Sequence, residues 1–189
     1  MKVKLIHTPA DPVRLSFPDI FQATDYQGDK KFRYNATLLV SPGGENHNRI
    51  EAAIKTVAAD EYGKKAEQFL AQWRGNAQKF CYLNGDTKEY EGYEGMMFLA
   101  CHRKQKDGPP TVLDRDKSPL VEASGRPYAG CFVNASTEIY AQGGLNAGIR
   151  ASFSGIQFVA DGDSFGGGAP ASPDEFEDLG VPETDPALV

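Results

Sequence analysis

The segment Lys30–Val40 (KKFRYNATLLV) alternates apolar and polar side chains with a period of two residues. The apolar positions are Phe32, Tyr34, Ala36, Leu38 and Val40, and the polar positions are Lys31, Arg33, Asn35 and Thr37. Successive side chains of a strand point to opposite faces of a sheet, so the alternation predicts a strand with one buried face. Half-buried strands of this kind are typical of antiparallel sheets, which favours a β-rich fold.

Further strand patterns lie on both sides of this segment. Val13–Phe21 predicts an earlier strand interrupted at Pro18, and Asp25–Asp29 predicts the turn that joins the two strands. After residue 73, clusters of Gly, Pro, Asn or Asp separate five more strand-like segments. These segments are Lys79–Leu83, Gly95–Lys104, Thr111–Asp114, Gly130–Ala141 and Gly148–Val159.

One segment between the strands has helical spacing instead. Its apolar residues recur at steps of three and four: Ile50, Ile54, Val57, Tyr62, Ala66, Phe69 and Trp73. Asn48 with Glu51 resembles an N-terminal cap, Gly63 is expected to divide the helix, and Gly75–Asn76 to end it. The order of elements predicts a mainly β (α+β) fold, an OB-fold-like antiparallel Greek-key barrel with a helical insertion at about residues 46–73.

Acidic residues are concentrated toward the C-terminus. Residues 160–189 contain eight Asp or Glu and no Lys or Arg, whereas residues 1–159 contain 20 basic and 18 acidic residues. The acidic segment also has four Pro and no apolar periodicity, so it cannot offset an ordering cost of about 1–2 kcal/mol per residue. We therefore expect one folded domain over residues 1–159 and a disordered acidic tail over residues 160–189.

The remaining composition argues for a cytoplasmic protein without a cofactor. No segment resembles a signal peptide or a membrane span, so no membrane contact is expected. Three Cys residues, Cys81, Cys101 and Cys131, are widely spaced among apolar residues and are expected to be buried, reduced thiols. The His residues do not cluster with them at the spacing of a zinc site, and no metal is predicted.

Motifs for catalysis are missing from the sequence. It contains no G-x-S-x-G elbow, no H-E-x-x-H pair and no nucleotide-binding Gly fingerprint, and Gly166–Gly168 lacks the Lys of a phosphate-binding loop. Asp114 and Asp116 share a strand face and could hold Mg²⁺ in a nuclease, although such acids are more often part of a solvated turn. The chain is predicted not to be an enzyme, with a Mg²⁺-dependent nuclease as an alternative.

A binding function fits the sequence better, because basic and aromatic residues interleave on the predicted strands. Single-stranded nucleic acid is held by a positive groove that follows the phosphates and by aromatic rings that stack on bases. The basic candidates are Lys30, Lys31, Arg33, Arg103, Lys104, Arg115, Lys117, Arg126 and Arg150, and the aromatic ones are Tyr82, Tyr90, Tyr93, Tyr128 and Tyr140. Other aromatic residues are predicted to lie in the core: Phe32, Trp73, Phe98, Phe132, Phe153 and Phe158.

Four runs of residues also resemble a known family. They are YEGYEGMMFLACHRK (Tyr90–Lys104), PPTVLDRD (Pro109–Asp116), YAGCFVNASTEIYA (Tyr128–Ala141) and GIRASFSGIQFVADGDSFGGG (Gly148–Gly168). Together with KFRYNATLLV and the acidic end, they resemble bacteriophage and prophage OB-fold single-stranded DNA-binding proteins, formerly a domain of unknown function. The likeness covers about residues 10–170.

The resemblance implies sequence-independent binding of single-stranded DNA during phage DNA replication or recombination, without catalysis, in the cytoplasm of an infected or lysogenic bacterium. The acidic tail is expected to compete with DNA and to recruit replication or recombination proteins through Asp174, Glu175, Phe176, Glu177 and Asp178. A structural or assembly protein of the virion is the alternative from another class. A monomer and a homo-oligomer are both compatible with the sequence.

Overall fold

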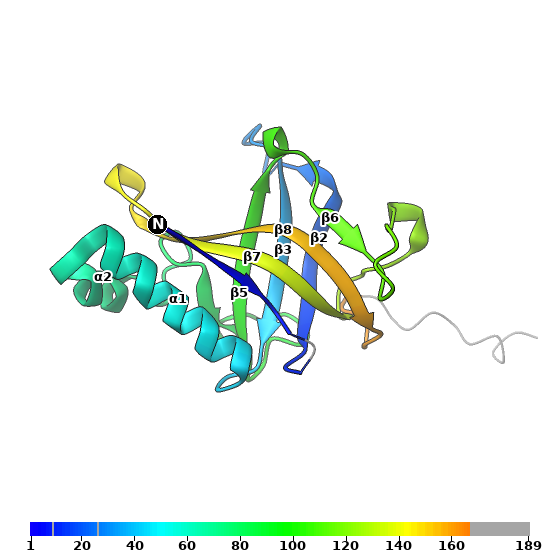
Figure 1. Cartoon of the computed structure of the whole chain (residues 1–189), viewed down its shortest axis with the longest axis horizontal. Helices are drawn as coiled ribbons and strands as arrows, with labels where there is room; N and C mark the ends of the chain where they lie inside the picture. Colours follow the sequence, from blue (N-terminus) through cyan, green and yellow to red (C-terminus); the bar gives the residue numbers. More distant parts are fainter. Residues whose placement is uncertain (9, 26, 167–189) are drawn as a thin grey trace, which may run out of the picture.

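The computed structural model describes residues 1–8, 10–25 and 27–166. One eight-stranded sheet curls into a partly open barrel, and two helices lie at one side of it (Figure 1). The strands are β1 (Lys2–Ile6), β2 (Val13–Thr24), β3 (Arg33–Val40), β4 (Tyr82–Asn84), β5 (Met97–Lys104), β6 (Thr111–Leu113), β7 (Phe132–Gln142) and β8 (Gly148–Ala160). The helices are α1 (Glu45–Tyr62) and α2 (Ala66–Trp73), separated by a 3-10 turn at Gly63–Lys65.

The strand order is β4-β5-β3-β2-β7-β8-β6, with β1 paired to β7. Phe80 forms a bridge with Ile149 of β8, and β5 contacts β8, so the strands β2, β3, β5, β8 and β7 follow one another around the barrel. In Figure 1, β7 and β8 run side by side across the direction of β2, β3 and β5. This is the partly open, five-stranded Greek-key arrangement of the OB-fold, as predicted.

The prediction of an antiparallel sheet is wrong for one strand. β6 pairs with β8 in parallel, at Thr111–Leu113 against Gly155–Gln157, whereas the other strand pairs are antiparallel. The connection from β6 to β8 includes residues 114–131 and all of β7, which is long enough for the two strands to run in the same direction.

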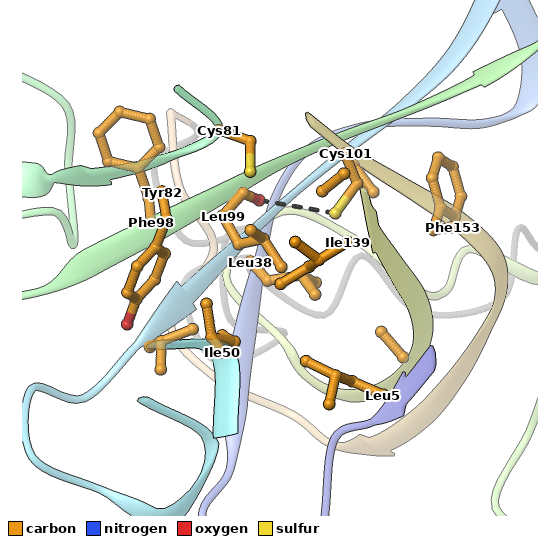
Figure 2. Close-up of a cluster of buried hydrophobic side chains, with 14 of the residues drawn as sticks. Leu5, Leu38, Ile50, Cys81, Tyr82, Phe98, Leu99, Cys101, Ile139 and Phe153 are labelled. Carbon is orange, nitrogen blue, oxygen red and sulfur yellow. Dashed lines mark hydrogen bonds between the residues drawn. The ribbon is translucent and has the colours of Figure 1, made fainter. Parts of the chain in front are cut away.

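The core of the barrel confirms the period-two pattern of β3. Tyr34, Ala36 and Leu38 are buried, and Leu38 lies in Figure 2 among side chains from other strands and from α1. Of the aromatic residues predicted to lie in the core, Phe98, Phe153 and Phe158 are buried and Phe132 is half-buried. The prediction for Phe32 is wrong: its side chain is 48% exposed, because β3 begins only at Arg33 and Phe32 belongs to the preceding loop.

Helix α1 packs on β7 and β1 and buries Ile50, Ile54 and Val57. Its predicted start is wrong, because α1 begins at Glu45 and Asn48 lies within its first turn. A residue distant in sequence supplies the missing cap: the carboxylate of Asp11 accepts a hydrogen bond of 2.7 Å from the backbone N–H of Asn46. A carboxylate at this position also interacts favourably with the helix dipole.

The two helices are joined to each other and to the barrel by aromatic side chains. Trp73, predicted as a buried anchor, is half-buried; its ring stacks on Phe69 at 5.0 Å and meets Tyr62 edge-on at 5.2 Å. The Tyr62 hydroxyl donates a hydrogen bond of 2.6 Å to the carbonyl of Gln142 at the end of β7. The break between the helices falls at Gly63, as predicted.

Both ends of the barrel differ from the prediction. Strand β1 was not anticipated, because KVKLI is short and pairs with β7 only through tertiary contact. After β8 the chain stays against the barrel as far as Gly166: Arg14 donates to the carbonyl of Asp163 at 2.7 Å, and the N–H of Phe165 donates to Ala129 at 3.0 Å. The folded part therefore extends beyond the boundary predicted at residue 160.

The three Cys residues are buried free thiols, as predicted. Burial raises the pKa of Cys131 to about 11 and that of Cys81 to about 12, so both stay protonated and unreactive at neutral pH. Over the residues that the structure describes, no helix is both long and apolar enough to cross a membrane.

Candidate nucleic-acid interface

A groove of about 810 Å³ crosses the outer faces of β2, β3 and β5. The strand alternation that buries Tyr34 and Ala36 turns Arg33, Asn35 and Thr37 toward this groove. Its lining is Phe17, Asp19, Thr24, Asp25, Arg33, Asn35, Thr37, Ala77, Gln78, Tyr90, Cys101 and His102. The groove is therefore lined by the polar face of β3, the strand whose alternating pattern is the clearest in the sequence.

A second, smaller hollow of about 120 Å³ continues this path toward β8. It shares Ala77 and His102 with the groove and adds Lys88 and Arg150 to its lining. The two hollows together run across β2, β3, β5 and the start of β8, transverse to the strands. A strand of nucleic acid laid in this direction would pass several strands of the barrel in turn.

Two exposed aromatic rings stand at the β2 side of the groove. Phe17 is 54% exposed and Tyr90 is 51% exposed, and their ring centroids lie 5.1 Å apart in an edge-to-face arrangement. Beneath them Tyr93 is buried, with its ring 5.4 Å from Tyr90 and its hydroxyl donating to Ser16 at 3.2 Å. Such exposed rings on a buried aromatic base form a platform on which a nucleobase can stack.

The backbone of β2 explains the position of Phe17. The β2–β3 register shifts between Ser16 and Asp19, which marks a bulge, and Phe17 has a φ of 46°. Pro18 has no N–H for the ladder, so the strand cannot continue its pairing there. The bulge interrupts the regular alternation of side chains along β2 and directs Phe17 outward.

A chain of hydrogen bonds fixes the polar floor of the groove. The amide nitrogen of Asn35 donates to Asp19 Oδ2 at 2.8 Å, and the Thr24 hydroxyl donates to the same oxygen at 2.8 Å. This orients the Asn35 carbonyl toward His102 Nδ1, 2.8 Å away, so Nδ1 carries the proton. Desolvation and the positive charges of Arg33 and Arg150 lower the pKa of His102, so the imidazole is neutral at pH 7 and its Nε2 is an acceptor.

Basic side chains lie at the ends of the groove. Arg33 is opposite Lys104 in the β3–β5 register, and Arg150 lines the far end. Arg33 also holds the loop before β3, because it bonds to the carboxylate of Asp29 at 2.5 Å and to the carbonyl of Lys31 at 3.0 Å. The same loop carries exposed Lys30 and Lys31.

The structure therefore brings together only part of the predicted set. The groove or its extension is lined by Arg33, Tyr90 and Arg150, and Lys104 lies opposite Arg33 in the β3–β5 register. Tyr140, on β7, is half-buried and does not line either hollow.

Several predicted binding residues have structural roles instead. Tyr82 and Tyr93 are buried, so the expectation that they present rings to DNA is wrong. Tyr82 donates or accepts a hydrogen bond of 2.8 Å with His47, and its ring belongs to the core shown in Figure 2. Half-buried Tyr128 donates to Asp161 at 2.8 Å and thereby holds the segment after β8.

The remaining predicted cations do not line the groove or its extension. Arg103 donates to the carbonyl of Gly108 at 2.7 Å in its own turn. The segment after β6 contains Arg115, Lys117 and Arg126. Strand β6 itself pairs with β8 at Gly155–Gln157 and not at the end of β8 that carries Arg150. These three cations are exposed, but they do not line the groove.

The acids considered for a nuclease are engaged locally. Asp114 forms an ion pair of 2.5 Å with Arg126, and Asp116 accepts hydrogen bonds from the backbone and hydroxyl of Ser118. The bonds from Ser118 lower the pKa of Asp116. Within the described part of the chain, no three His, Cys, Asp or Glu side chains are grouped to hold a metal ion.

The tail residues named for partner binding, Asp174, Glu175, Phe176, Glu177 and Asp178, lie outside the described residues. Conversely, most residues that line the groove were not predicted as binding residues, among them Phe17, Asp19 and His102. Pro18 inside a strand pattern was a usable signal for a bulge that would expose Phe17. No sequence signal connects Asp19 with His102, because Asn35 links them only through the β2–β3–β5 pairing.

Comparison with known proteins gives one family and several structural neighbours. The family model described as "Enterobacter phage Enc34, ssDNA-binding protein" matches residues 3–186. Protein p50 of Acyrthosiphon pisum secondary endosymbiont phage 1 is 40% identical over 190 residues, which cover 100% of this chain and 99% of p50.

The solved structures share the fold at low sequence identity. The single-stranded DNA-binding protein from bacteriophage Enc34 in complex with ssDNA has a TM-score of 0.68 and 18% identity, over 87% of this chain and 89% of that chain. The single-stranded DNA-binding protein gp2.5 encoded by bacteriophage T7 has a TM-score of 0.54 and 14% identity, over 96% of this chain and 98% of that chain.

Proposed function

This chain belongs to the Enterobacter phage Enc34 ssDNA-binding protein family, and we propose that it binds single-stranded DNA in the groove across β2, β3 and β5. The observation that carries the proposal is the exposed pair of Phe17 and Tyr90 at the edge of a groove with basic ends. Stacking on such rings tolerates every base, because each base has an aromatic face. The main contribution to binding is therefore independent of the DNA sequence.

The positions of the cations suggest how the strand is oriented. Arg33 and Lys104 lie at one end, and Lys88 and Arg150 at the other, while the floor between them contains the carboxylate of Asp19. Phosphates are attracted to the ends and repelled from the floor. Bases are the part of the strand that fits over the floor and against the aromatic pair.

A titration of a labelled oligodeoxythymidine and of a duplex of equal length tests this function. The single strand is expected to bind more tightly, and about three to five phosphate contacts give a slope of log K against log salt of about −2 to −3.5. Fluorescence anisotropy measures both quantities. If the protein does not bind the single strand, or if salt does not weaken the binding, the proposal is contradicted. The alternative function, a structural protein of the virion, would then be favoured.

We further propose that the protein acts in phage DNA replication or recombination in the host cytoplasm, where single strands are exposed and must be kept accessible. The family membership supports this role. The local bonds of Asp114 and Asp116 argue against a nuclease active site at these residues. The protein is thus proposed to hold DNA without cleaving it.

The acidic segment after residue 166 is proposed to compete with DNA for the groove and to recruit partner proteins. It contains six Asp or Glu and no Lys or Arg, whereas residues 1–166 contain 20 basic and 20 acidic residues. Its attraction is therefore to the cations at the ends of the groove and not to an overall positive charge of the body. A tethered competitor acts at high effective concentration even when its own affinity is low. Because this competition is electrostatic, it weakens as salt increases.

Removal of residues 167–189 is therefore expected to raise the affinity for oligodeoxythymidine several-fold at low salt, with a smaller gain at high salt. The cut falls after Gly166 because residues up to that position contact the barrel. The matched control keeps the chain length and replaces the six acids with amides: Asp174, Glu175, Glu177, Asp178, Glu183 and Asp185. Equal affinities for the full chain, the truncated chain and the control would show that the acidic segment does not compete.

A further inference from the structure

We propose that the groove contains a subsite for a guanine base, stacked against Phe17 and Tyr90 and bonded through its Watson–Crick edge to the carboxylate of Asp19. The inference rests on the proposed binding of single-stranded DNA and adds a preference at one base to an otherwise sequence-independent contact. It starts from an unexpected feature, a carboxylate in the floor of a groove whose ends are basic.

The carboxylate of Asp19 is held in one orientation but retains capacity to accept hydrogen bonds. Asn35 and Thr24 both donate to its Oδ2, at 2.8 Å each. Its Oδ1 accepts no hydrogen bond from any residue that the structure describes, and a carboxylate has about four acceptor sites in all. Asp19 is thus preorganised to accept N–H groups from a ligand in the groove.

The groups beside Asp19 reinforce this preference for donors. Both polar ends of the Asn35 amide are engaged, one with Asp19 and the other with His102. Neutral His102 has its remaining nitrogen, Nε2, as an acceptor. A phosphate, which has only acceptor oxygens, is disfavoured over such a floor, whereas a base edge with N–H donors is favoured.

Guanine matches this floor best among the bases of DNA. Its Watson–Crick edge places a ring N–H next to an exocyclic amino group, and both donors can bond to Oδ1 of Asp19, whose two acceptor sites remain open among the described residues. Thymine offers a single ring N–H between carbonyls, which a carboxylate repels. Adenine and cytosine have the amino group but an unprotonated ring nitrogen beside it. The purine ring also covers more of the Phe17 and Tyr90 platform than a pyrimidine does.

The experiment compares thymidine oligomers in which several positions carry guanine or inosine. Inosine lacks only the exocyclic amino group of guanine, so stacking and phosphate contacts stay the same. The wild-type protein is expected to bind the guanine oligomer about fivefold to tenfold more tightly than the inosine oligomer, the lower end of the range for specific base contacts. Fluorescence anisotropy at a fixed salt concentration gives both affinities.

Two variants locate the effect. Asp19→Asn places an amide NH₂ where the free oxygen stood, so the ratio of guanine to inosine affinity should fall to about one. Asp25→Asn removes the same charge from the same groove, and its ratio should stay at the wild-type value. A melting curve for each variant verifies that the fold is retained. Because both variants lose one negative charge, the change in phosphate attraction is matched.

The outcomes separate this inference from the proposed function. Tight binding of both oligomers with equal affinity would overturn the guanine subsite and leave single-stranded DNA binding in place. A guanine preference that persists in Asp19→Asn would also overturn the assignment to this carboxylate. Failure to bind either oligomer would overturn the proposed function together with the subsite.

Discussion

Replacement of both Phe17 and Tyr90 by Ala is expected to weaken binding of single-stranded DNA by at least about fivefold and up to about 150-fold. This range corresponds to the loss of one stacked base, worth about 1–3 kcal/mol. Both rings are about half exposed and pack edge-to-face at 5.1 Å, so their removal takes away the platform and little of the core. Titration of oligodeoxythymidine measures the effect.

The matched control for this double variant keeps the aromatic rings. Phe17→Tyr with Tyr90→Phe exchanges the two ring types and is expected to bind within about twofold of the wild type, since stacking is preserved. The melting temperature of the double Ala variant should stay close to that of the wild type. Unchanged affinity of the double Ala variant would mean that DNA does not pass over this pair.

Replacement of Tyr93 by Ala is expected to lower the free energy of unfolding by about 3–5 kcal/mol, as for other large aromatic residues in a core. The Tyr93 side chain is 2% exposed and its ring lies 5.3 Å from that of Phe98. Denaturant unfolding followed by fluorescence or circular dichroism measures the change. Any apparent loss of DNA affinity in this variant should be accounted for by the fraction of the protein that is unfolded.

Tyr93→Phe separates the packing of this ring from its hydrogen bond. The variant loses only the hydroxyl that donates to Ser16 at 3.2 Å, so the cost should be about 0.5–1.5 kcal/mol. A Tyr93→Ala protein with wild-type stability and weakened DNA binding would contradict the placement of Tyr93 in the core. The contrast with Tyr90, three residues earlier, makes this pair of positions informative.

Much of the fold could be predicted because its signals are local. The alternation of β3 identified its buried face, the three and four residue spacing identified α1 and α2, and Gly63 identified the break between them. What failed depended on partners distant in sequence. The start of α1 is set by Asp11, and the direction of β6 is set by its place beside β8.

The candidate site shows the same division. Arg33, on β3, and Tyr90, in the loop before β5, could be predicted as groove residues because basic and aromatic side chains suit single strands. Tyr82, on β4, and Tyr93, in the loop before β5, are the same residue type but are buried, because a Tyr ring serves core packing as well as binding. Asp19 and His102 become a unit only through Asn35, a contact that three paired strands create.

Photochemical crosslinking of a bound oligomer containing 5-iododeoxyuridine tests most directly whether the groove holds single-stranded DNA. Iodinated bases crosslink to aromatic residues that they touch, and mass spectrometry identifies the peptides. The predicted crosslinks are to Phe17 and Tyr90, with competition by unlabelled oligodeoxythymidine. Crosslinks confined to half-buried Phe132, Tyr128 or Tyr140, none of which lines the groove, would contradict the assignment of the groove as the binding surface.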